Sequence, residues 1–207
     1  MKGRRTWLHR TAAAVAAACL LAAPALAEVT IKGDRAAYDE VVASFKKLFA
    51  LPGYRMKFTF EANQTAVVEI TPPNGFHTTA HTSNGNMEMI STGGKTATKI
   101  DMPGAPTGWR CTVAAPRQPF TIPDPDKAVR EGSGTIDVSR GADTNIEGTP
   151  VHTYISTSNG GKDTIYVGSQ TGLPRRIVSD KSSGQPTTID YYDYGANIVL
   201  TMPPCTQ

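Results

Sequence analysis

The chain has 207 residues, 39% of them hydrophobic and 19% charged, and its formal net charge is +3. The first 27 residues hold four of the 21 basic side chains and no acidic one, so residues 28–207 carry 17 basic and 18 acidic groups, a net charge of −1. This balance argues against a nucleic-acid-binding protein, which needs a basic surface. The remaining 180 residues (207 − 27) fit a single domain with a substantial core.

The N-terminus has the pattern of an export signal. A basic start precedes a run rich in Ala and Leu, and Ala25-Leu26-Ala27 matches the small-x-small pattern of a cleavage site. We expect residues 1–27 to be removed, so that a periplasmic protein begins at Glu28; secretion is the less favoured alternative. The apolar run is too short to favour a spanning helix. Arg4-Arg5 loosely resembles a twin-arginine signal, so the export route stays open.

One amphipathic helix is predicted over residues 34–50. Asp34 is a typical N-cap, and Pro52 cannot continue a helix and also disfavours helical geometry at Leu51. Between them, apolar residues recur at helical spacing on one face. They are Tyr38, Val41, Val42, Phe45, Leu48 and Phe49.

Short strands fill the rest of the chain. Residues 54–60 alternate between apolar and polar side chains, which indicates a strand with one apolar face. Asn84-Gly85 is a strong hairpin signal, and a two-residue loop there would pair Thr82 with Met87. Asp124 is expected to cap a short helix at 125–131. Further strands are predicted at 66–70, 76–83, 86–92, 95–100, 133–139, 149–157, 163–168, 174–180, 186–194 and 197–201, and a loop at 103–108, which makes the fold α+β.

Two cysteines, Cys111 and Cys205, remain after residue 27. In an oxidising compartment two cysteines are most simply one disulfide, here across 94 residues (205 − 111). A reactive thiol or a metal pair is the alternative, but no basic or histidine-rich neighbourhood activates either cysteine. We therefore predict a structural disulfide that ties the C-terminal tail to the middle of the chain.

The second half of the sequence resembles a known family. The resemblance rests on three stretches: Glu147 to Tyr154, Thr171-Gly172-Leu173-Pro174-Arg175-Arg176 and Thr188 to Gly195. They resemble the LolA-like superfamily of periplasmic lipoprotein carriers, mycobacterial lipid-binding lipoproteins and an envelope-stress sensory domain. The resemblance implies a curved antiparallel half-barrel of about eleven strands, with helices over its concave face and a hydrophobic cavity between them. We find no match to the carriers' inward-facing arginine.

A ligand site in such a fold would use the apolar faces of the helix and the first strands. A pocket for a hydrophobic ligand is mostly apolar, and methionine adapts to irregular shapes. The alternative is that these side chains simply pack beneath the helix. The candidate ligand-binding residues are Phe45, Phe49, Tyr54, Met56, Phe58, Phe60, Val68, Ile70, Phe76, Met87 and Met89.

A soft-metal site is the minor alternative. His77 and His81 would lie about 13 Å apart on one strand, too far to share a metal. The expected hairpin register puts Met87 and Met89 on the opposite face, whereas a three-residue loop would bring His81 opposite Met89.

The sequence favours a binding protein over an enzyme. It has no G-x-S-x-G elbow, no HExxH and no phosphate-cradling glycine loop, so we expect no catalysis and no cofactor. We expect an exported, monomeric envelope protein that binds or carries a lipid or other hydrophobic molecule, with the helix acting as a lid. The rival is an envelope interaction or sensory module whose cavity is filled and whose partner is another envelope protein.

Overall fold

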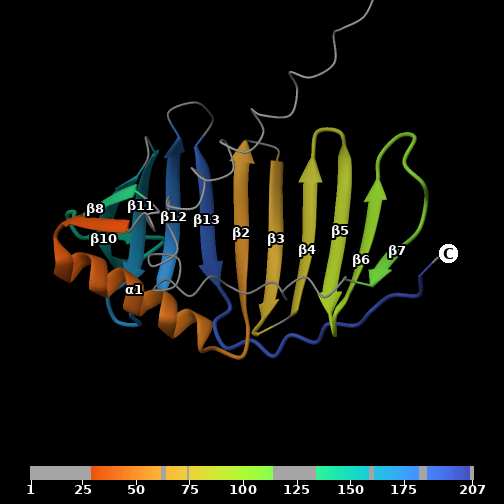
Figure 1. Ribbon diagram of the computed structural model, residues 1–207, viewed down its shortest axis with the longest axis horizontal. Helices are drawn as coiled ribbons and strands as arrows, with labels where there is room; N and C mark the ends of the chain where they lie inside the picture. Colours follow the sequence, from red (N-terminus) through yellow and green to blue (C-terminus); the bar gives the residue numbers. More distant parts are fainter. Residues whose placement is uncertain are drawn as a thin grey trace, which may run out of the picture.

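The computed structural model describes residues 29–61, 64–73, 75–113, 134–158, 161–181 and 186–205. In these ranges the chain forms one curved 13-stranded sheet with one helix, α1 (Arg35–Phe49), packed on one end of it (Figure 1). The predicted α+β half-barrel is confirmed. Across the sheet the order is β1 (Val29–Gly33), β8 (Gly134–Arg140), β10 (Thr149–Ser158), β11 (Gly161–Gly168), β12 (Pro174–Lys181), β13 (Thr187–Tyr192), β2 (Tyr54–Glu61), β3 (Gln64–Thr71), β4 (Gly75–Thr82), β5 (Gly85–Thr92), β6 (Lys95–Asp101) and β7 (Arg110–Val113), with β9 (Thr144–Ile146) beside β10.

All pairs in the sheet are antiparallel except one. Strand β1 runs parallel to β8, with Ile31 opposite Ile136. Strand β13 pairs with β2 and so joins the C-terminal strands to the N-terminal ones. We did not predict β1 or the three-residue β9.

Helix α1 begins and ends as its sequence predicts. The Asp34 side chain accepts hydrogen bonds from the amides of Ala36 and Ala37 at 2.9 and 3.1 Å, which is N-cap geometry. The Asp34 amide also donates to the Val138 carbonyl at 2.7 Å, so the start of the helix is fixed to β8.

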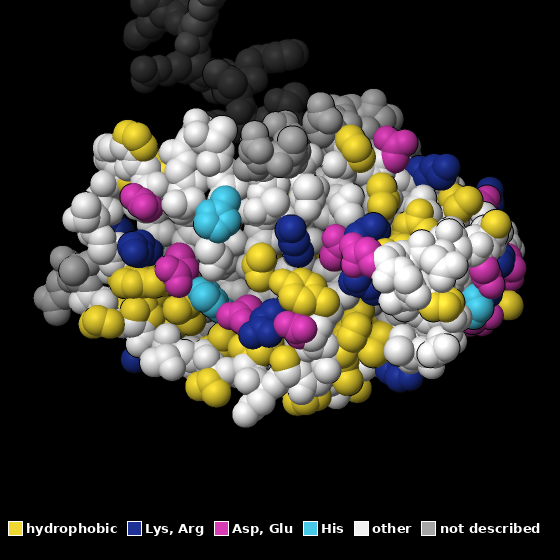
Figure 2. All heavy atoms as spheres, turned by 180° about the vertical axis from the view of Figure 1, so that it is seen from behind, with side chains coloured by type: hydrophobic (Ala, Val, Ile, Leu, Met, Phe, Trp, Pro, Cys, Tyr) yellow, Lys and Arg dark blue, Asp and Glu magenta, His cyan; other side chains and the backbone are white. Residues whose placement is uncertain are grey.

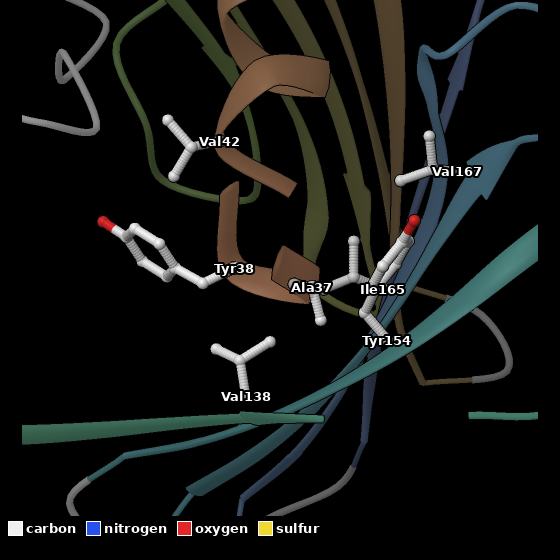
Figure 3. Packing of buried hydrophobic residues seen from close by; sticks show 7 residues of the cluster. All are labelled: Ala37, Tyr38, Val42, Val138, Tyr154, Ile165 and Val167. Atoms are coloured by element: carbon white, nitrogen blue, oxygen red, sulfur yellow. The ribbon is translucent and has the colours of Figure 1, made fainter. Parts of the chain in front are cut away.

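The helix packs through two hydrophobic clusters on the face that we call the inner face of the sheet. The first joins Ala37, Tyr38 and Val42 to strands β8, β10 and β11 (Figure 3). The second is built around Leu48, which is fully buried. Its other buried members are Tyr54, Ile70, Leu173 and Tyr191.

The β4–β5 hairpin forms, but the predicted register is wrong. Thr82 pairs with Gly85, so Ser83 and Asn84 make the turn, and Met87 lies opposite Ala80. Gly85 is needed for another reason: a Cβ there would lie 2.2 Å from the Asp101 carbonyl oxygen of β6. A glycine is required at position 85 because β6 packs too closely for a side chain there.

The predicted strand at 197–201 is also wrong. Residues 196–205, here called the C-terminal strap, form no strand and run along the ends of β2–β6 towards β7 (Figure 1). The Ile198 and Leu200 side chains approach the backbone at Gly53 and Gly75, whereas Val199 points to solvent. This explains the alternating pattern, since an extended segment buries every second side chain with or without a ladder partner.

The predicted disulfide is confirmed. Cys111 of β7 is bonded to Cys205, and their Cα atoms lie 5.6 Å apart. The export signal and the expected helix at 125–131 lie outside the described residues. No helix in the described ranges is both long and apolar enough to span a membrane.

Candidate functional site

An unbroken row of apolar side chains crosses the inner face. Directly opposite residues of antiparallel neighbours share a face, so the register identifies its members. The row starts beneath α1 on β10 and ends on β6. It consists of Tyr154, Ile165, Ile177, Ile189, Phe58, Ala66, Ala80, Met87 and Ile100, and we call it the apolar row.

The apolar row is most buried at its end beneath α1 and most exposed at its far end, with Ala66 between them at 7% exposed. Tyr154 is 1% exposed and Ile165 is 8% exposed, whereas Ile100 at the far end is 37% exposed. Phe58 and Met87 between them are half-buried. The helix packs on β8, β10 and β11 through one cluster and reaches Tyr54, Ile70 and Tyr191 through the other, whereas Phe58, Met87 and Ile100 belong to neither cluster.

The predicted ligand-binding residues fall into two groups. Tyr54 and Ile70 are each 2% exposed and belong to the core around Leu48. Five more pack partly buried against that core: Phe45, Phe49, Met56, Val68 and Phe76. The remaining four lie beyond it; Phe58, Met87 and Met89 are half-buried, and Phe60 is 43% exposed.

Two groups of aromatic rings lie where the core beneath α1 meets the rest of the inner face. The Phe45 ring of α1 lies 6.1 Å from the Tyr191 ring in an edge-on arrangement and 6.0 Å from the Phe49 ring. On β2, the Phe58 and Phe60 rings stack at 6.1 Å with an interplanar angle of 14°. Such rings offer large apolar contact areas with defined geometry.

The tyrosines beneath the helix remain neutral over a wide pH range. Burial raises the pKa of Tyr54 to about 12. Burial also raises the pKa of Tyr191, and the neighbouring phenols of Tyr54 and Tyr194 raise it further. Below pH 10 the face near the helix therefore carries no phenolate charge.

The opposite, outer face carries a line of charged groups that the sequence did not predict (Figure 2). Arg55 binds Asp193 at 2.6 Å and Glu69 at 2.7 Å. His77 lies between two carboxylates, with Nδ1 2.8 Å from Glu69 Oε2 and Nε2 3.0 Å from Glu88 Oε1. Burial opposes ionisation of Glu69, but hydrogen bonds from His77 and Arg55 outweigh it and lower the pKa of that carboxyl.

This geometry does not support the soft-metal alternative. His77 lies opposite Ile90 and His81 opposite Asn86 on the outer face, while both methionines of β5 point inward. In the described residues, no group of three or more His, Cys, Asp or Glu side chains could hold a metal ion.

A second polar network fixes the helix to β8 and β10. Glu40 of α1 accepts hydrogen bonds from the Tyr154 hydroxyl and from Arg140, the latter at 3.0 Å. Arg140 also binds Asp143, which lies 2.9 Å from His152. The sequence does not reveal this network, because Glu40 lies 100 residues from Arg140 and 114 from Tyr154.

The C-terminal end of α1 contacts the turn that contains the Thr-Gly-Leu-Pro stretch. The Lys47 ammonium donates to the Thr171 carbonyl at 2.5 Å. The turn is closed by the Gly172 amide, which donates to the Gly168 carbonyl at 2.7 Å. This stretch is therefore a docking element for the helix.

The comparisons with known proteins agree with this architecture. No family model matches the sequence, and no curated protein does. The structure is similar to the lipoprotein LppX of Mycobacterium tuberculosis, with a TM-score of 0.60 and 11% identity, covering 82% of this chain and 100% of that one. It is also similar to LprF of Mycobacterium bovis, with a TM-score of 0.58 and 14% identity, covering 83% of this chain and 99% of that one. The chain has the LolA-like fold. At these identities the likeness concerns the LolA-like fold alone.

Proposed function

We propose that this chain is an exported cell-envelope protein that binds or carries a lipid or another hydrophobic molecule on the inner face of its half-barrel. One observation carries the proposal: the apolar row continues past α1, with half-buried or exposed side chains at Phe58, Met87 and Ile100. Exposed apolar side chains gathered on one face mark binding surfaces. The similarity in fold to the lipoprotein LppX supports a location in the cell envelope.

The helix serves this function as a fixed wall. Opening it as a lid would expose Leu48 and Ala37, which are 0% and 2% exposed, and break its contacts at both ends. Burying a side chain the size of Leu contributes about 1.5–3 kcal/mol, so displacement by a ligand is costly. The ligand therefore lies beside the helix, on β2–β6, with Phe45 and Phe49 at the boundary.

The direct test is native mass spectrometry of the protein purified from its own envelope, followed by solvent extraction. A discrete adduct that reappears in the extract as a lipid is the expected result. A clean unliganded mass, with no uptake of added fatty acids or phospholipids, would overturn the proposal.

Two substitutions locate the site. Phe58→Gln and Met89→Gln place a bulky polar group on the inner face and should abolish lipid uptake while the domain stays folded, because an unpaired amide resists apolar contact. Lys57→Gln is the matched control, since Lys57 is the outward neighbour of Phe58 on the same strand. Normal uptake by both inner-face variants would refute the location.

A further inference from the structure

A second row on the inner face changes from apolar to polar as it approaches the edge of the sheet. It runs beside the apolar row from β2 to β7. In register, its members are Met56, Val68, Thr78, Met89, Thr98 and Arg110. The row thus has an apolar end near the helix, hydroxyl groups further out, and a cation on the edge strand.

Arg110 is unusual in charge and in pairing. Among the described side chains on the inner face of β13 and β2–β7, it is the only charged one, because the alternation of each strand puts the other charges outward. Arg110 is exposed, and it forms no hydrogen bond or ion pair with other described residues. By contrast, the five other described arginines each pair with a carboxylate: Arg35, Arg55, Arg140, Arg175 and Arg176.

The spacing suits an amphiphilic molecule. Neighbouring strands lie about 4.8 Å apart, so five spacings separate Met56 from Arg110 by about 24 Å of mostly apolar surface. A guanidinium binds the oxygens of phosphate in a planar, bidentate arrangement. Thr98 lies directly opposite Arg110 and Thr112 is the next inward residue of β7, so two hydroxyl donors flank the cation.

We propose that the ligand of the inner face is a phospholipid with an anionic headgroup. Its acyl chains lie along the apolar side chains of β2–β5, and its phosphate binds Arg110 with the neighbouring threonine hydroxyls. This inference rests on the proposed function and adds the headgroup and its orientation: the head lies at the β7 edge and the chains point towards α1.

The test compares dioleoyl phosphatidylglycerol with dioleoyl phosphatidylcholine, each offered in neutral detergent micelles to the purified, delipidated protein. Bound lipid is measured after gel filtration. The wild type should bind the glycerol lipid about tenfold more tightly, because the choline cation repels the guanidinium. Arg110→Ala should lose that preference and weaken the binding of both lipids, since both carry the phosphate that Arg110 binds. Arg110→Glu should reverse the preference. Inorganic phosphate should not compete, because it lacks the acyl chains.

Lys95→Ala is the matched control. Lys95 is an exposed cation on the outer side of the neighbouring strand β6, so its removal changes the net charge equally without touching the inner face. A preference that survives Arg110→Ala, or is lost equally in Lys95→Ala, overturns the inference. Equal binding of both lipids by the wild type does the same but leaves the proposed function standing. Binding of neither lipid would refute both.

Discussion

The disulfide at the end of the C-terminal strap should be a major source of stability. Cys111 and Cys205 are 94 residues apart, and the chain-entropy relation for a loop of that length gives about 4.7 kcal/mol at 25 °C. We expect the double variant Cys111→Ser/Cys205→Ser to lose up to this amount of unfolding free energy. Typical single-domain stabilities are about 5–15 kcal/mol, so the loss would leave a marginal protein.

The measurement is urea unfolding at equilibrium, followed by circular dichroism and extrapolated to water. Leu200→Ala is the control, since it removes a half-buried contact of the strap above Gly75 while the disulfide stays intact. It should cost only about 1 kcal/mol. If the double variant loses no more than Leu200→Ala, the loop-closure reasoning is refuted and the strap stabilises the fold through its contacts alone.

Three further predictions concern single side chains. Asp34→Ala should lower the free energy of unfolding by about 1 kcal/mol, measured by urea unfolding, because two amides lose their acceptor. Burial opposes ionisation of Glu69, but hydrogen bonds from His77 and Arg55 outweigh it and lower the pKa of Glu69 below 4.5 in the folded protein. The ionised Glu69 therefore adds to the free energy of unfolding above pH 4.5, and this contribution is lost as the pH falls through the pKa of the folded state. Glu69→Gln should therefore flatten the acid limb of stability against pH, and an unchanged limb would contradict this. Burial raises the Tyr54 pKa from 10.0 to about 12, so its contribution is complete below pH 10 and lost as the pH rises through 12; Tyr54→Phe should flatten the alkaline limb.

Elements whose signals are local were predicted well. The cap at Asp34 and the stop at Pro52 lie within the helix and its flanks, and the alternation of β2 is complete within eight residues. Strand β1 was missed because five residues with one parallel partner more than a hundred positions away leave little local pattern. Strand β9 is only three residues long, and its turn depends on positive φ angles at Glu147 and Gly148.

Two errors share a physical cause. The conformational freedom of glycine predicts Gly85 in the turn, and period-two alternation predicts a strand at 197–201, but both are local properties of the sequence. What determines their roles is a neighbour distant in sequence: the Asp101 carbonyl beside Gly85, and the strand ends beneath Ile198 and Leu200. A sequence pattern predicts that a backbone is extended, but only the register of the sheet shows which strand, if any, it pairs with.

The same reasoning explains why the resemblance revealed the fold before the ligand. The Thr-Gly-Leu-Pro stretch receives Lys47 of the helix, and Asp193, in the Asp-Tyr-Gly stretch, binds Arg55 at the β13–β2 junction. Both of these contacts hold elements of the fold together. Arg110, in contrast, stands in an unremarkable stretch of the sequence, and its inward position follows only from the successive registers of β2 to β7. In this fold the two motifs therefore stabilise contacts between elements, whereas the proposed headgroup site depends on side chains that no short motif connects.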